Sequence, residues 1–247
     1  MGMPFGIDIR DAVAHEEPEP VERLLTSCFA ELRRADETFS LWRTDTPLSR
    51  LTSGQAALAE MPADVLEVLR LCAQWAADTQ GWFSARTPDG SVDPSGLVKS
   101  WAVRRVARRL LAAGLRHWCI NAAGDVLVHG QARPGEPWAV GIQHPFHAGL
   151  LLDTVTLTVG AVATSGTAAR GRHVWDPVRG GPARGVASAS VLARDLVEAD
   201  VLATAAVARG PEAAGWLDRM SGVEALLVGD DGAVVSTSGW PRLRLVP

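Results

Sequence analysis

The chain has 247 residues, of which 28 are Asp or Glu and 24 are Lys or Arg, for a formal net charge of −4. A chain of this length can bury roughly 70–75% of its unfolded surface, so its stability requires no disulfide or structural metal. Its acidic balance argues against nucleic acid or an anionic membrane as the main partner, because both attract basic surfaces. No tyrosine is present, which excludes a tyrosine nucleophile or base.

The cysteines and the N-terminus indicate the compartment. Cys28, Cys72 and Cys119 are isolated and odd in number, which favours a reducing environment over a disulfide framework. The first residues carry no secretory signal pattern, and no uncharged run approaches the roughly 18 residues of a membrane span. We therefore expect a soluble, cytoplasmic protein without membrane insertion.

The first half of the chain has a helical pattern. Apolar residues at helical spacing predict an amphipathic helix over 19–35, and a polar loop follows over 36–54. A second helix is predicted to begin at 62–64, before a stretch rich in Gly, Pro, Ser and Asp over 81–96 that reads as loop. A third helix over 97–113 carries four arginines that suit a solvated face better than an anion site.

In the second half of the chain, polar and apolar residues alternate and β-branched residues are frequent. One helix is predicted over 196–209, and Asp231-Gly232 predicts a hairpin. The predicted strands lie at 117–128, 138–143, 153–163, 185–193 and 223–236. Helices followed by strands indicate an α+β fold with an antiparallel or mixed sheet, in a single domain over 1–247 with two intimately packed lobes.

Several familiar signatures are missing. Residues 96–100 superficially resemble a phosphate loop but lack the Gly before Lys99 and the required spacing to an earlier Gly. His144 and His147 lie in a Pro-containing loop without a third ligand nearby in sequence, so incidental loop histidines are favoured over a zinc site.

The helix over 196–209 carries a pair of oxygen ligands. Asp200 and Thr204 are four residues apart and therefore share one helix face. Mg²⁺ accepts such hard oxygens and takes the rest of its shell from water and phosphate. The alternative is structural: Asp200 complements the helix dipole, and the Thr204 hydroxyl bonds its own backbone.

Two further clusters bear on this choice. Residues 93–99 open a helix after a tight turn, whose free N–H groups can hold a diphosphate. The other cluster consists of residues 163–167, followed by residues 173–177 and Gly180. Ordinary turn chemistry explains either cluster alone.

Taken in order, these segments resemble the ApbE-like family of FAD:protein FMN transferases over nearly the whole chain. The motifs that carry the resemblance lie at residues 1–5, 39–43, 48–52, 93–99, 121–125, 138–145, 163–166, 173–177 and 199–205. The resemblance implies an ApbE-like, T-fold-related mixed sheet with packed helices.

The resemblance also implies a site. Mg²⁺ would be held by the Gly96 carbonyl, the Asp200 carboxylate and the Thr204 hydroxyl. For a base near the incoming hydroxyl, the chemistry of the imidazole makes His173 the candidate; contacting the flavin or ordering its loop is the alternative. FAD would contact Met1, Trp42, Trp82, Phe83, Ser84, Asp93, Lys99 and the backbone around Trp175.

The implied reaction moves the FMN moiety of FAD onto a threonine hydroxyl of an acceptor protein with a Ser/Thr flavinylation motif, releasing AMP. Mg²⁺ would neutralise the diphosphate in this acidic protein. Two alternatives use the same residues: an FAD diphosphatase that yields FMN and AMP, and a flavin-binding module without turnover. The chain departs from the family pattern at Trp42, Thr52, Ser84, Ser100 and Ala123.

Overall fold

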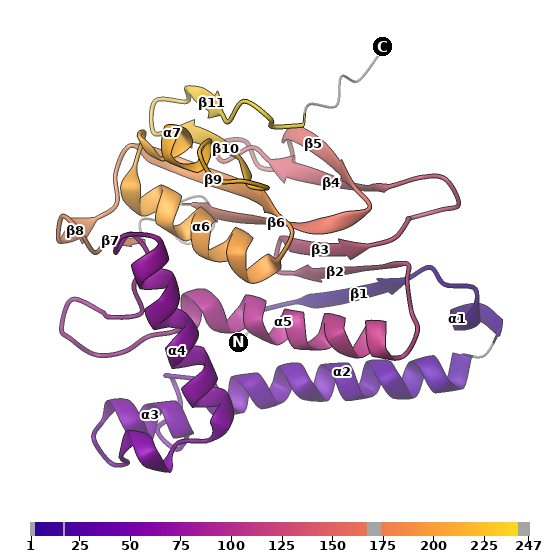
Figure 1. The fold of residues 1–247 in the computed structure, drawn as a ribbon, viewed down its shortest axis with the longest axis horizontal. Helices are drawn as coiled ribbons and strands as arrows, with labels where there is room; N and C mark the ends of the chain where they lie inside the picture. Colours follow the sequence, from indigo (N-terminus) through magenta and orange to yellow (C-terminus); the bar gives the residue numbers. More distant parts are fainter. Residues whose placement is uncertain (1–2, 17, 167–173, 242–247) are drawn as a thin grey trace.

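A computed structural model describes residues 3–16, 18–166 and 174–241. Its centre is a seven-stranded sheet in the order β1-β2-β3-β6-β9-β10-β11, shown in Figure 1. These strands are Phe5–Ile9 (β1), Trp118–Ala122 (β2), Asp125–His129 (β3), Val159–Gly166 (β6), Val186–Ala193 (β9), Glu224–Gly229 (β10) and Val234–Ser236 (β11). Every described strand pair in this sheet is antiparallel. The sequence had left an antiparallel or a mixed sheet open, and the described sheet is antiparallel.

Helices cover one face of this sheet. The helix α6 (Leu196–Arg209) packs on β6 and β9, and α5 (Ser95–Ala112) packs on α6. The helices α2 (Pro18–Phe39) and α4 (Ala63–Asp78) both pack on α5. Because α6 packs on the sheet with one side and on the neighbouring α5 with another, nearly all of its side chains are buried.

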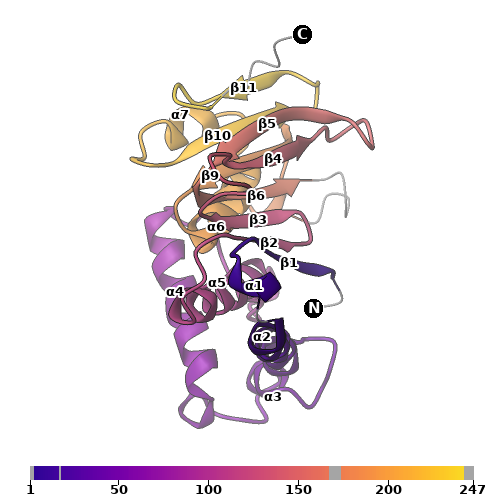
Figure 2. The same cartoon turned by 90° about the vertical axis from the view of Figure 1, so that its right-hand side faces the viewer.

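A separate hairpin covers the other face. The strands β4 (Trp138–Gln143) and β5 (Leu151–Leu157) pair with each other, and Figure 2 shows them opposite α6. In β4 alternate side chains are buried, as expected for a strand with one face on a core. They pack against apolar side chains of β3, β6 and β10 in a second hydrophobic cluster.

The remaining elements are short. They are α1 (Val13–Glu16), α3 (Pro47–Thr52), the 3₁₀ helix η1 (Leu58–Glu60), β7 (Trp175–Asp176), β8 (Gly181–Pro182) and α7 (Ala213–Leu217). No helix in the described part of the chain is long and apolar enough to cross a membrane.

The α+β class is confirmed, and so are the helix over 196–209, the strand over 138–143 and the hairpin at Asp231-Gly232. The single strand predicted over 117–128 is wrong. Ala123 (φ 54°) and Gly124 (φ 103°) both adopt left-handed conformations and form a two-residue turn between β2 and β3. The run predicted over 153–163 likewise divides into β5 and β6.

The loop predicted over 36–54 is also wrong. The helix α2 continues to Phe39, and α3 follows with Thr46 as its N-cap. The Thr46 hydroxyl accepts the Ser49 N–H, and Pro47 occupies the first helical turn, where its missing donor costs nothing.

Candidate functional site

Three charged side chains from distant segments meet between α5, β3 and α6. Lys99 of α5 is in ion-pair contact with Asp125, the first residue of β3, and its Nζ lies 3.7 Å from Asp200 Oδ1 of α6. Asp125 is 2% exposed and Asp200 is 5% exposed, whereas the Lys99 side chain is 20% exposed. The cluster is therefore a largely buried lysine between two carboxylates.

Asp125 fixes this cluster to the sheet. Its Oδ1 accepts the Thr164 N–H of β6 at 3.0 Å, while the same carboxylate contacts Lys99. The sequence analysis placed Asp125 in a family motif but gave it no role. The only sequence signal for a role was its place directly after the Ala123-Gly124 turn.

Asp200 and Thr204 share one face of α6, as their spacing predicted. Asp195 is the N-cap of this helix, and its Oδ1 accepts the Val197 N–H at 2.8 Å. The acidic residue at the start of this helix is therefore Asp195, whereas Asp200, for which the alternative interpretation was a helix-dipole role, lies in the second turn. The Thr204 hydroxyl lies 3.0 Å from the Ser165 hydroxyl of β6, so α6 and the sheet contribute neighbouring oxygen atoms.

The Asp200 carboxylate is incompletely satisfied. Its Oδ2 is buried without a hydrogen-bond partner among the described residues. Burial raises the pKa of Asp200 to about 7; the Lys99 charge opposes this effect and the Asp125 charge adds to it. A buried oxygen of this kind normally has a donor, a water or a cation beside it.

The donor set suits a hard cation. The Asp200 carboxylate and the Thr204 hydroxyl both offer oxygen, which Mg²⁺ prefers. Among residues 3–16, 18–166 and 174–241, no three His, Cys, Asp or Glu side chains gather in the manner of a protein-only metal site. A cation held here would therefore complete its shell with hydroxyl, carbonyl, water or phosphate oxygens.

Gly96, the third proposed metal ligand, lies in the first turn of α5, three residues before Lys99. A Cβ at this position would lie 3.3 Å from Phe83 Cε2, so glycine allows the turn to rest on the Phe83 ring. Phe83 is 3% exposed, which makes its side chain a support for α5. Its contact with FAD stays a prediction.

The other predicted contacts are more dispersed. Trp82 and Ser84 are partly buried on either side of Phe83. Asp93 Oδ1 accepts the Ser95 N–H at 2.8 Å, just before the Gly96 turn. Trp175 in β7 is 38% exposed, and Trp42, after the end of α2, is 98% exposed. Met1 and His173 lie outside the described residues.

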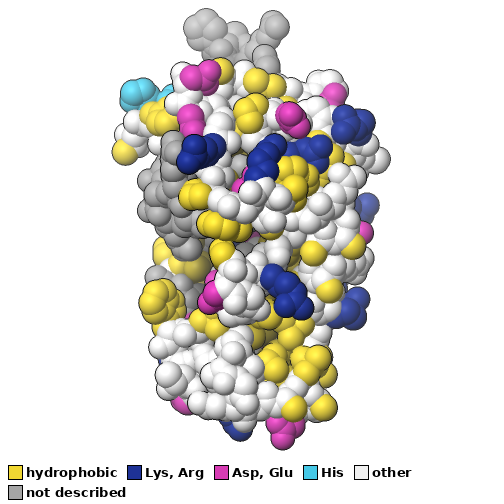
Figure 3. Space-filling model, turned by 90° about the vertical axis from the view of Figure 1, so that its left-hand side faces the viewer, with side chains coloured by type: hydrophobic (Ala, Val, Ile, Leu, Met, Phe, Trp, Pro, Cys, Tyr) yellow, Lys and Arg dark blue, Asp and Glu magenta, His cyan; other side chains and the backbone are white. Residues whose placement is uncertain are grey.

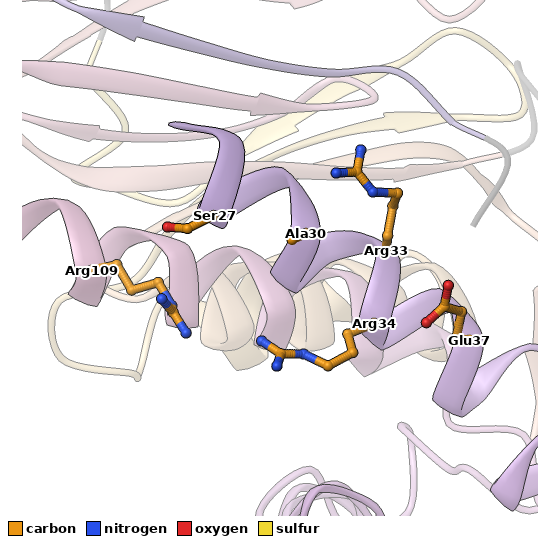
Figure 4. A pocket seen from close by; sticks show the side chains of 6 residues that line it. All are labelled: Ser27, Ala30, Arg33, Arg34, Glu37 and Arg109. Atoms are coloured by element: carbon orange, nitrogen blue, oxygen red, sulfur yellow. The ribbon is translucent and has the colours of Figure 1, made fainter. Parts of the chain in front are cut away.

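The arginine-rich face of α5 is mostly accounted for within the protein. Arg105 Nε lies 2.6 Å and Arg109 Nη2 lies 3.2 Å from the buried Glu31 carboxylate of α2. Figure 4 shows Arg109 and Arg34 beside an open pocket of about 500 Å³ between these helices. Arg34 of α2 contacts the same carboxylate. Ion pairing with Glu31 therefore explains Arg105 and Arg109 better than anion binding does.

Comparison with known proteins identifies a family and several relatives. A model described as the ApbE family matches residues 1–87 and 84–227. The FAD:protein FMN transferase of Rhodobacter capsulatus is 34% identical over 167 residues, which are 64% of this chain and 31% of that protein. The FAD:protein FMN transferase of Vibrio cholerae is 30% identical over 135 residues, which are 51% of this chain and 40% of that protein. The chain thus spans between 31% and 50% of the length of curated relatives that it matches.

Solved structures share the fold. The flavin transferase ApbE from Vibrio cholerae superposes with a TM-score of 0.79 at 22% identity, covering 98% of this chain and 96% of that one. The ApbE protein from Thermotoga maritima gives a TM-score of 0.81 at 20% identity, covering 96% of this chain and 94% of that one. The similarity therefore extends over the sheet and all the helices that build the site.

Proposed function

The chain belongs to the ApbE family, and from this membership we propose that it transfers the FMN moiety of FAD to a threonine hydroxyl of an acceptor protein. AMP is the other product, and the reaction depends on Mg²⁺. The observation that carries the proposal is the buried Asp200 Oδ2 without a hydrogen-bond partner in the described part of the chain. Asp200 lies on the same helix face as Thr204, and its other oxygen, Oδ1, lies 3.7 Å from Lys99 Nζ.

In this proposal Asp200, Thr204 and the Gly96 carbonyl would hold Mg²⁺. The bound ion would neutralise the diphosphate and stabilise the AMP leaving group. Asp125 holds Lys99 close to Asp200, so that the ammonium adds positive charge where the substrate carries negative charge. In the first turn of α5 the Ser95 N–H donates to Asp93, and the Leu97 and Val98 N–H groups donate to the Pro94 carbonyl. We therefore assign the neutralisation of the diphosphate to Mg²⁺ and Lys99 and not to a set of free N–H groups, as the sequence had suggested.

The remaining work is positioning. The threonine hydroxyl must approach the FMN phosphorus in line with the departing AMP oxygen. We assign acceptance of the hydroxyl proton to His173, because an imidazole titrates near neutral pH. No covalent intermediate with this chain is required.

The proposal is tested by incubating the protein with FAD, MgCl₂ and an acceptor protein that has a Ser/Thr flavinylation motif. Flavin fluorescence that stays with the acceptor after denaturation, together with stoichiometric AMP, is the expected result. Free FMN with AMP would identify an FAD diphosphatase, and bound but unchanged FAD would identify a binding module. Chelation with EDTA should stop the transfer, and excess MgCl₂ should restore it.

A further inference from the structure

Two arginines and two tryptophans form a stacked group, here called the Arg–Trp cluster: Arg179, Arg209, Trp82 and Trp216. The Arg179 Cζ lies 4.8 Å from the centre of the Trp82 ring. The Arg209 Cζ lies 5.3 Å from the Trp82 ring and 5.1 Å from the Trp216 ring. Figure 3 shows the face that carries β7 and β8, where Lys and Arg side chains gather beside hydrophobic ones in the upper half.

Arg209 depends on these rings. It is the last residue of α6, and its Nε and Nη1 are buried without a hydrogen-bond acceptor in the described residues. A guanidinium that has lost water needs another source of electrostatic stabilisation. The two indole faces supply it, and such contacts are stronger when they are desolvated. Trp216 in α7 is only 5% exposed, so one side of the stack is fixed in the core.

Arg179 connects the cluster to the β7 turn. Its Nη1 donates to Asp176 Oδ2 at 3.0 Å and to the Arg209 carbonyl at 3.3 Å. Asp176 is buried and also accepts the Val178 and Arg179 N–H groups. Arg179 is therefore held in place on one side by Asp176 and stacks on Trp82 with the other.

Trp82 in turn belongs to the segment that supports the site. The helix α4 ends in a left-handed Gln80 (φ 56°) and Gly81 (φ 87°), with Gly81 N–H donating to the Ala76 carbonyl. The chain then turns into Trp82 and Phe83, and Phe83 rests under Gly96 at the start of α5. A continuous set of contacts thus runs from Arg209 through Trp82 and Phe83 to the turn that carries Gly96.

We infer that Arg209 and Arg179 are positioning residues for the FAD site, acting through Trp82. They lock the 82–84 segment against the ends of α6 and β7, so that this segment and the Gly96 turn are ordered before FAD arrives. The inference rests on the proposed function. Pre-ordering a binding segment lowers the entropy cost of binding, so its loss should appear in affinity for FAD more than in the chemical step.

The test removes the charge of Arg209 and keeps an unbranched, flexible side chain at this position. In Arg209→Met we expect KM for FAD to rise about tenfold, with kcat changed less than about twofold. Arg209→Lys, which keeps a cation over the rings, should recover most of this loss. The matched control is Arg219→Met: Arg219 follows α7, and its Nη1 donates to the Gly215 carbonyl of the same segment, so KM should equal that of the unchanged protein.

A double-mutant cycle tests the route through Trp82. Trp82→Leu should raise KM for FAD by a similar factor, and adding Arg209→Met should then have almost no further effect. Effects that multiply, or an unchanged KM in Arg209→Met, overturn the inference. If Arg209→Met does not fold, Arg179→Met decides, because the Arg179 side chain is 54% exposed. If the unchanged protein neither binds nor turns over FAD, the proposed function has failed and not this inference alone.

Discussion

Asp200 faces Thr204 because residues four apart on a helix share a side, and this pairing was predictable from the sequence. The partners of Asp200 were not. Lys99 precedes it by about a hundred positions, and Asp125 joins the cluster only because α5 and β3 are brought together by the fold. Sequence spacing predicts contacts within one element, but contacts between elements depend on how the elements pack.

The first prediction concerns the Asp200 carboxylate. Asp200→Asn keeps the shape of the side chain and removes the anionic oxygen proposed to hold Mg²⁺. We expect Mg²⁺-dependent flavin transfer to fall at least ~100-fold, with a circular dichroism spectrum unchanged from the parent. Glu198→Gln, on the same helix, is the control and should retain activity. Full activity in Asp200→Asn would contradict the metal assignment.

The second prediction is a pH dependence of stability in the metal-free protein. Burial raises the pKa of Asp200 to about 7, with Lys99 opposing and Asp125 reinforcing the shift. The folded state therefore binds more protons than the unfolded state between pH ~4 and ~7. The free energy of unfolding should fall across this interval, by at most about 4 kcal/mol, and then level off.

Urea unfolding in EDTA at a series of pH values measures this slope. Asp200→Asn, which has no proton to lose, should flatten the part of the curve that belongs to this residue. Parallel curves for the two proteins would show that Asp200 titrates normally in the folded state.

At the scale of elements, helices were easier to predict than strand boundaries. Apolar residues at helical spacing identified α2, α4, α5 and α6, although α2 extends four residues beyond its predicted end. The hairpin between β2 and β3 was missed because Ala123 carries none of the usual signal for a left-handed residue. Continuous apolar patterning similarly concealed the break between β5 and β6.

A buried carboxylate that the sequence analysis did not identify connects the helices through ion pairs. Glu31 of α2 is 3% exposed and contacts Arg105 and Arg109 of α5. Arg105 also donates to Asp64 of α4 at 2.8 Å. One buried carboxylate thereby links α2 to α5, and Arg105 extends the link to α4.

The third prediction follows from this link. Glu31→Gln leaves the surrounding guanidinium groups without their shared counter-charge, so we expect the free energy of unfolding to drop by about 3 kcal/mol. The exposed Glu22 on the same helix provides a control, and Glu22→Gln should change it by less than ~0.5 kcal/mol. Equal stabilities of the two variants, measured by urea unfolding, would mean that the ion pairs of Glu31 contribute nothing net.

At the scale of the whole molecule, the order of helices and strands correctly indicated an α+β fold. It could not indicate that β4 and β5 leave the main sheet and pack on its second face. That arrangement joins β3 to β6 across an intervening hairpin, and no local signal specifies which strands pair over such a distance.

The fourth prediction uses the cysteines as a probe of the whole fold. Cys28 and Cys72 are buried, and burial raises the pKa of Cys72 to about 12 and that of the partly buried Cys119 to about 11. Since the thiolate is the reactive form, an aromatic disulfide reagent at pH 8 should react slowly with the native protein and rapidly with all three thiols in guanidinium chloride. A native thiol that reacts as fast as free cysteine would contradict this.

The small side chains of α6 have a further consequence. Ala199, Ala203 and Ala206 are fully buried where this helix meets its neighbours, so little more than methyl groups separates its backbone from theirs. The helix acts as a spacer of fixed thickness, and the 3.0 Å between the Thr204 and Ser165 hydroxyls depends on that thickness. The distance between the oxygen atoms of the site thus depends on buried alanines elsewhere on α6. Replacing one of these alanines with valine would push the helix away from its neighbour and change that distance.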